Sequence, residues 1–167
     1  AIMRLEQEGF VEIQPRRGVF IRRKSREEVL EMVEMWAALE SMAARIACER
    51  AGDAEIAGLR AIAGRYGPDD ARAELGEYSE ANIAFHGAIL RLSANGRIID
   101  TAEALLAHLK PVRRRAMADP ERAERSVVDH GDIIAALEAR DADRAERLVR
   151  EHTLRLRGYL GRHWDAI

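Results

Sequence analysis

Four polar residues of this 167-residue chain stand where helical spacing turns them toward the interior. Asn82 and His86 are one helical turn apart, and His130 and His152 each share a face with apolar residues. The apolar neighbours at helical spacing are Ile89 and Leu90, then Ile133, Ile134 and Leu137, then Leu148 and Leu156. A buried imidazole without a partner costs about 1–3 kcal/mol. We therefore expect the three histidines to meet around one metal ion, although a single inward histidine is more often only a hydrogen-bonded core residue.

Such a site fits two classes of function. A metal ion with open positions can hold the oxygens of a small acid in a sensor, or it can activate water in a metal-dependent hydrolase. The hydrolase is disfavoured because Glu80 lies on a different helix face from His86, and no His-Glu-x-x-His motif or Gly-rich phosphate loop occurs. We favour the sensor and expect no catalytic residue. Imidazole and amide ligands suit Zn, Ni, Co or Mn.

A helical body must position these side chains. The apolar periodicity predicts six helices that form an all-α antiparallel bundle. Their expected ranges are roughly 26–51, 53–63, 68–93, a helix that follows Gly96, 120–139, and a helix from Asp141 to the chain end. Pro111 is expected to kink or break the fourth helix.

Composition narrows the class of protein further. The chain is 47% hydrophobic and 34% charged, as in a globular domain. Its one cysteine, Cys48, excludes an internal disulfide and a cysteine-based zinc ribbon, and fits a reducing cytosol. No apolar run approaches the roughly 20 residues of a membrane span. We expect a cytoplasmic protein without a membrane partner.

The N-terminal segment has a different charge from the rest of the chain. Residues 1–26 hold seven basic and three acidic side chains, whereas the whole chain has a net charge of −2. Strand-like runs at 10–13 and 19–21 flank a turn that carries Arg16, Arg17 and Gly18. An arginine-tipped ribbon suits phosphate contact and entry into the minor groove of DNA, although a solvated hairpin would look the same.

Residues 1–11 and 15–21 resemble the end of the winged helix-turn-helix of GntR-family transcription regulators. In that family a Leu-Glu-x-x-Gly-Phe-Val run, here Leu5 to Val11, ends the recognition helix. An Arg-Gly-x-Phe run, here Arg17 to Phe20, closes the wing. The resemblance implies that residues 1–24 are a remnant of a DNA-binding domain, with its first helices expected upstream of Ala1. Residues 25–167 would form a helical effector and dimerisation domain.

The helical part is similar to the FadR C-terminal (FCD) ligand-binding domain. The markers are Leu39-Glu40, Phe85-His86, Asp129-His130, Asp141 to Asp143, and Glu151-His152. Many members bind a divalent metal through an Asp-x-x-x-His pair and two later histidines. These positions correspond here to Asn82, His86, His130 and His152. The resemblance also implies a homodimer, a small organic acid as effector, and operator binding that responds to it, as in a repressor.

Three departures from the family pattern bear on the site, the mildest being Asp129 in place of the more frequent Glu before the second histidine. Asn82 stands where metal-binding members have Asp, so it can offer an oxygen but no negative charge, and metal affinity should fall. Trp36 stands where an arginine often meets the effector, which suggests a bulkier effector or an anion held from another helix. Arg113, Arg114 and Arg115 are the expected substitutes, of which Arg113 and Arg114 are preferred, with Trp36 and Tyr78 beside the effector. The alternatives are core packing for the aromatic residues and a solvated basic stretch for the arginines.

Overall fold

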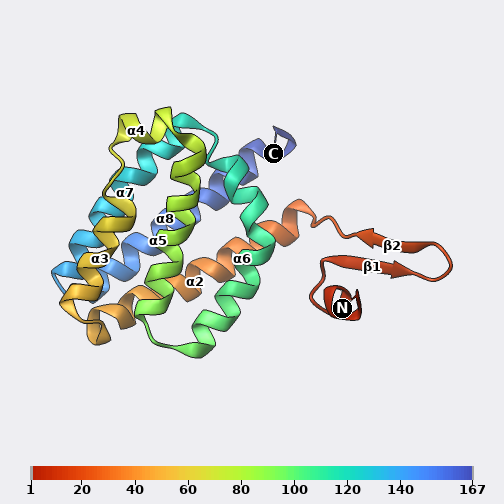
Figure 1. The fold of residues 1–167 in the computed structure, drawn as a ribbon, viewed down its shortest axis with the longest axis horizontal. Coiled ribbons are helices and arrows are strands. Elements are labelled where there is room, and N and C mark those ends of the chain that lie inside the picture. Colours follow the sequence, from red (N-terminus) through yellow and green to blue (C-terminus); the bar gives the residue numbers. More distant parts are fainter. Residues whose placement is uncertain (1, 167) are drawn as a thin grey trace.

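Helices make up most of the chain, as the computed structural model of residues 2–166 shows (Figure 1). A short helix, α1 (Ile2–Gln7), precedes a hairpin of β1 (Val11–Gln14) and β2 (Gly18–Ile21). The body follows as α2 (Arg26–Arg50), α3 (Asp53–Ala63), α4 (Pro68–Ala73), α5 (Leu75–Leu92), α6 (Gly96–Ala116), α7 (Pro120–Glu138), α8 (Ala142–His163) and a 3-10 turn, η1 (Trp164–Ala166). The predicted helical bundle with a preceding two-stranded ribbon is confirmed. None of the helices within residues 2–166 combines the length and apolarity needed to cross a membrane.

The long helix α2 runs through the middle of the bundle, and α8 packs along it (Figure 1). Its start is fixed by a capping box. The Ser25 hydroxyl accepts from the Glu28 N–H at 3.1 Å, and the Glu28 carboxylate accepts from the Ser25 N–H at 2.8 Å. One face of α2 is buried over its whole length, with the members Val29, Val33, Trp36, Ala37, Glu40, Ala43, Ala44 and Ala47. Small residues on this face let neighbouring helices approach closely, and Glu40 is its one acidic member.

The body contains seven helices rather than the six predicted. The segment expected as one helix over 68–93 is divided at Glu74, whose backbone leaves the helical region at φ −119° and ψ 49°. Gly76 is the only nearby residue with low helix propensity, so the sequence signals this break weakly. Conversely, α6 continues through Pro111, where a kink or break was expected. The missing proline N–H removes one hydrogen bond without ending the helix.

The hairpin extends away from the bundle (Figure 1). Its strands pair in an antiparallel register that sets Val11 opposite Ile21 and Gln14 opposite Gly18. Arg16 and Arg17 are exposed at the tip, where the Arg17 N–H donates to the Gln14 carbonyl at 3.0 Å. Gly18 has a φ of +112°, a conformation that L side chains rarely adopt, so this turn requires its glycine.

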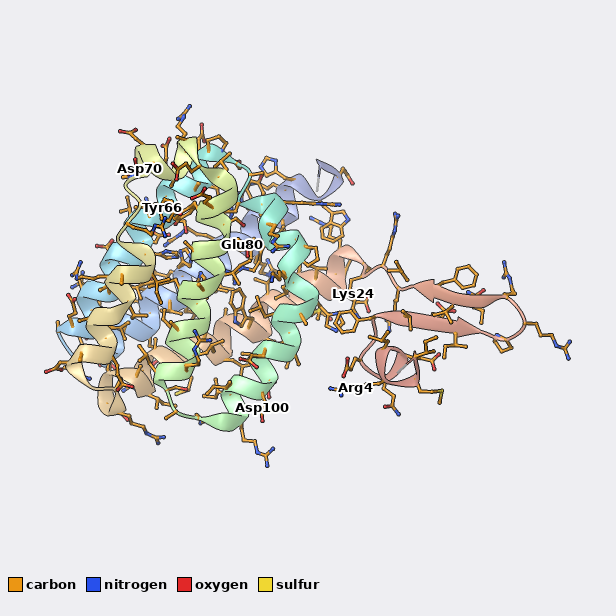
Figure 2. The ribbon with its side chains drawn as sticks, in the orientation of Figure 1. Arg4, Lys24, Tyr66, Asp70, Glu80 and Asp100 are labelled. Atoms are coloured by element: carbon orange, nitrogen blue, oxygen red, sulfur yellow. The ribbon has the colours of Figure 1, made fainter. Side chains whose placement is uncertain are left out.

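One aromatic contact joins the hairpin segment to the body. The Phe10 ring stacks on the His108 ring of α6, with centroids 4.1 Å apart. Figure 2 shows Lys24 at the junction where the hairpin leads into α2, on the same side of the body. The predicted boundary between residues 24 and 25 stays a prediction.

Candidate metal centre

Three helices each bring one histidine to a common point inside the body. His86 comes from α5, His130 from α7 and His152 from α8, and all three are buried. One ring nitrogen of each lies within 4.8 Å of the others. The closest approach is between the Nε2 atoms of His86 and His152, which are 3.2 Å apart. The sequence predicted this meeting.

Two buried carboxylates hold the outer nitrogens of this pair. Glu40 of α2 forms a short hydrogen bond with Nδ1 of His86 and accepts from the Thr153 hydroxyl at 3.0 Å. Asp129 of α7 lies 3.0 Å from Nδ1 of His152. A carboxylate accepts hydrogen bonds, so each ring places its proton on Nδ1 and leaves a lone pair on Nε2. Both lone pairs therefore point at the same space.

Facing lone pairs repel unless a cation lies between them. Burial lowers the pKa values of His86 and His130 well below the ordinary histidine range, and neighbouring cationic groups lower them further. Burial also lowers the pKa of His152, although Asp129 acts in the opposite direction. A shared proton is thus disfavoured. Two imidazole nitrogens on one tetrahedral Zn²⁺ lie about 3.3 Å apart, given metal–nitrogen distances of about 2.0–2.1 Å, so the observed separation fits a metal ion.

The carboxylate of Glu40 responds to the charge of the centre. Burial raises its pKa to about 7, while the positive charge of Arg113 acts to lower it. A cation among the histidines would act in the same direction as Arg113 and favour the ionised form. Binding of a metal ion and ionisation of Glu40 would therefore support each other.

Asn82 lies in this cluster, but its oxygen points to another partner. Its Oδ1 accepts from Nη2 of Arg113 at 2.8 Å. Its Nδ2 donates to the Ser126 hydroxyl at 3.0 Å and lies 3.3 Å from Nε2 of His130. Asn82 thus links Arg113 to His130. A neutral amide at this position adds no negative charge beside Arg113, whose charge is opposed by that of Glu40.

The predicted effector residues separate into two groups. Trp36, Tyr78 and Arg113 are buried around the centre, and the Arg113 guanidinium lies 3.9 Å from the centroid of the Trp36 ring. Arg114 lies outside, where it forms an exposed ion pair with Glu80 at 2.6 Å.

Several buried donors near the centre have no acceptor. Within residues 2–166, the enclosed side-chain atoms without a hydrogen-bond partner are Trp36 Nε1, Tyr78 Oη, Arg113 Nη1 and Arg122 Nε. Every one of these groups carries a hydrogen that it can donate, and each unsatisfied donor costs about 1–3 kcal/mol. This part of the interior is short of acceptors, which a ligand rich in oxygen would supply.

Sequence reasoning missed the roles of the two carboxylates. Glu40 carried a signal, because it lies four residues after Trp36 and three before Ala43 on the buried face of α2. Asp129 was noted only as part of the Asp129-His130 family marker, and its contact with His152 could not be foreseen because it joins two helices whose relative register is set by packing.

Comparison with known proteins adds an independent line of evidence. The family model for the FCD domain matches residues 31–155. The Nta operon transcriptional regulator of Aminobacter aminovorans is 28% identical over 167 residues, which cover 100% of this chain and 74% of that protein. The HTH-type transcriptional repressor RspR of Escherichia coli K12 is 26% identical over 152 residues, which cover 91% of this chain and 67% of that protein.

Solved structures share the fold. E. coli McbR/YncC matches with a TM-score of 0.79 and 18% identity, over 92% of this chain and 78% of that chain. The Listeria monocytogenes protein Lar matches with a TM-score of 0.74 and 14% identity, over 96% of this chain and 77% of that chain.

The hydrogen bonds predict the tautomers of two histidines. In the metal-free chain, at a pH well above the Glu40 pKa of about 7, ¹⁵N NMR should find His86 and His152 protonated at Nδ1, because the ionised Glu40 and Asp129 accept there. Asp129→Asn should alter the signals of His152 while leaving the tautomer of His86 unchanged, which gives an internal control. Protonation of both rings at Nε2 would contradict the assignment.

Proposed function

Because this chain belongs to the FCD domain family of GntR-type transcription regulators, we propose that its helical body senses a small carboxylate ligand through a bound divalent metal ion. The observation that carries the proposal is the pair of Nε2 atoms, 3.2 Å apart, whose outer nitrogens are held by carboxylates. The unsatisfied donors beside them support an acidic ligand.

His86, His130 and His152 would hold the metal ion, with Zn, Ni, Co and Mn as candidates. Bound there, a divalent ion would supply a positive charge that attracts carboxylate oxygens. Asn82 joins the ligand set in this proposal once Arg113 has turned to the acid, because its Oδ1 is then free to face the histidines.

The acid itself would lie against Arg113, Trp36 and Tyr78. Arg113 is 5% exposed and has one guanidinium nitrogen without a partner, so an incoming carboxylate gains a charge-assisted hydrogen bond in a desolvated setting. The Trp36 Nε1 donor has the same need for an acceptor, whereas the Tyr78 hydroxyl has Ser126 and Asn82 as polar neighbours. Arg114 has no part in this subsite because Glu80 already pairs with it at the surface.

A hydrolase remains the weaker alternative. A catalytic metal site needs a carboxylate or histidine free to take a proton from water. Glu40 and Asp129 are both engaged with histidine Nδ1 atoms, so neither is free for that role. The related proteins with assigned roles are transcription regulators, which agrees with a sensor.

The ligand site and the hairpin share helix α6. Arg113 lies in the site, and His108, five residues earlier on the same helix, stacks on Phe10. We propose that a ligand-induced shift of α6 changes this contact and with it the position of the hairpin on DNA. The active form in this proposal is a cytoplasmic homodimer on operator DNA.

Metal binding should stabilise the folded chain. A saturating ion at about 100 times its dissociation constant adds about 2.7 kcal/mol, which corresponds to a rise in Tm of roughly 5–10 °C for a chain of this length. Thermal unfolding with and without Zn²⁺ or Ni²⁺ measures the rise. His130→Ala should abolish it, whereas His108→Ala, outside the centre, should preserve it. Equal rises in the two variants would refute the site.

The hairpin tip should contact DNA phosphates. In a form of the protein that has a complete winged helix, Arg16→Ala with Arg17→Ala should lower the slope of log K against log salt by about 2, since each phosphate contact contributes about 0.9. Fluorescence polarisation at several salt concentrations measures it. Arg147→Ala, which removes an exposed arginine of α8 that pairs with Glu151, is the control. An unchanged slope in the double variant would show that the tip does not touch phosphate.

A further inference from the structure

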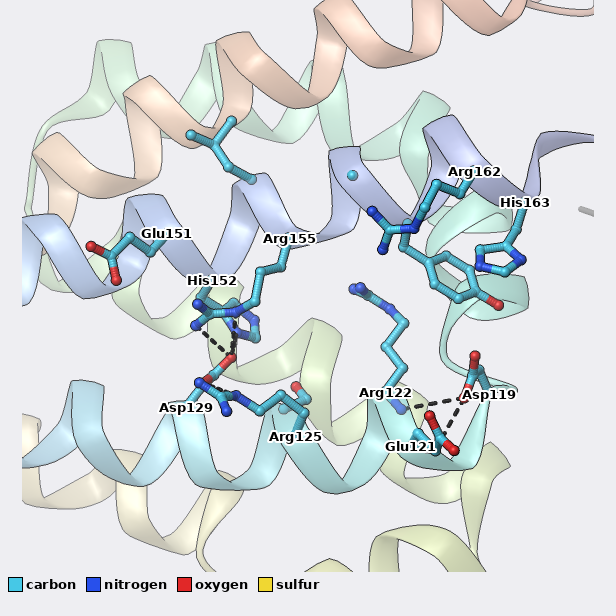
Figure 3. Close-up of a pocket in the computed structure, with 14 residues that line it drawn as sticks. Asp119, Glu121, Arg122, Arg125, Asp129, Glu151, His152, Arg155, Arg162 and His163 are labelled. Atoms are coloured by element: carbon cyan, nitrogen blue, oxygen red, sulfur yellow. Dashed lines mark hydrogen bonds and ion pairs between the residues drawn. The ribbon is translucent and has the colours of Figure 1, made fainter.

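A pocket between α7 and α8 leads to the metal centre (Figure 3). Its volume is about 790 Å³, within the range of small-molecule sites. Asp129, Ser126 and His152 form part of its lining. Ser126 also accepts a hydrogen bond from Asn82, which contacts His130. The pocket and the histidine cluster are therefore adjacent.

Arg122 is the arginine of this pocket whose Nε is enclosed without a partner, whereas Arg162, which also lines the pocket, is exposed. Arg125 and Arg155 both pair with Asp129, at 3.0 and 2.7 Å. The Nε of Arg122 is enclosed without a hydrogen-bond partner, and the guanidinium lies 5.3 Å from the centroid of the Tyr159 ring. Burial lowers the pKa of Arg122 to about 10. Figure 3 shows its side chain extending from α7 into the space between the two helices.

The charged side chains that contact the centre and the inner pocket are mostly basic. Glu40 and Asp129 are acidic, whereas Arg113, Arg122, Arg125 and Arg155 are basic, and the last two already pair with Asp129. A divalent ion on the histidines would add two more positive charges to this enclosed region. Uncompensated charge in a low-dielectric interior is costly, so the bound ligand must balance it.

We infer that the ligand is an acid with two anionic groups, one held at Arg113 and the histidine centre and the other held by Arg122 in the α7–α8 pocket. This inference rests on the proposed function and sharpens it, because it assigns the ligand class and a second subsite. The first anionic group would accept hydrogen bonds from Arg113 Nη1 and Trp36 Nε1. The second would accept a hydrogen bond from Arg122 Nε. The Tyr159 ring then lies beside the second group.

Matched acids test the number of anionic groups. Calorimetric titration of the Zn²⁺-loaded chain compares succinate with butyrate, and phthalate with benzoate, so that each pair differs chiefly in the second carboxylate. The diacid of at least one pair should bind about tenfold more tightly, as expected for one added charge-assisted contact. Arg122→Gln should remove that preference and Arg122→Lys should keep part of it. Arg114→Gln, which removes an exposed arginine, should leave it intact.

The outcomes separate this inference from the proposed function. Equal affinities within both pairs, no binding of either diacid, or an undiminished preference in Arg122→Gln would each overturn the two-group ligand. If butyrate or benzoate still binds and binding requires Zn²⁺, the metal-dependent sensor stands without it. If the chain takes up no Zn²⁺, both the sensor and the two-group ligand are refuted.

Discussion

The interior of this protein depends on two imidazole nitrogens that face each other at 3.2 Å with their outer nitrogens held by carboxylates. Because Glu40 and Asp129 fix the protons on the outer side, the inner side has no proton of its own to share. The histidines come from different helices, so whatever binds between them also ties α5, α7 and α8 together. A cation at this point would explain why three polar residues occupy space that apolar side chains would otherwise fill.

The same constraint accounts for the second half of the site. A positive ion beside Arg113 makes the interior more cationic, and the neutral amide of Asn82 does nothing to offset it. The unsatisfied donors of Trp36 and Arg113 lie beside His86, with the Arg113 guanidinium over the Trp36 ring. Metal and acid are therefore complementary, since each reduces the electrostatic cost of the other. With asparagine in place of aspartate at position 82, a negative charge beside the metal ion has to come from the ligand.

Much of this arrangement could be predicted from the sequence because it rests on local periodicity. The inward direction of His86, His130 and His152 follows from the apolar residues one turn away on each helix. The break at Glu74 was missed since no strong helix breaker marks it. At Pro111, where a kink or a break was expected, α6 continues, because the helix tolerates one lost hydrogen bond. The pairing of Asp129 with His152 and the isolation of Arg122 depend on how α7 packs against α8. A single sequence contains no direct record of that packing.

The most direct test of the metal centre is the metal content of the untagged chain, purified without chelator and measured by elemental analysis. The structure leads us to expect about one divalent ion per chain, as for a site that folds around its ion. A value near zero that persists after incubation with Zn²⁺ and Ni²⁺ would contradict the metal centre. It would also assign the three histidines to hydrogen bonding alone.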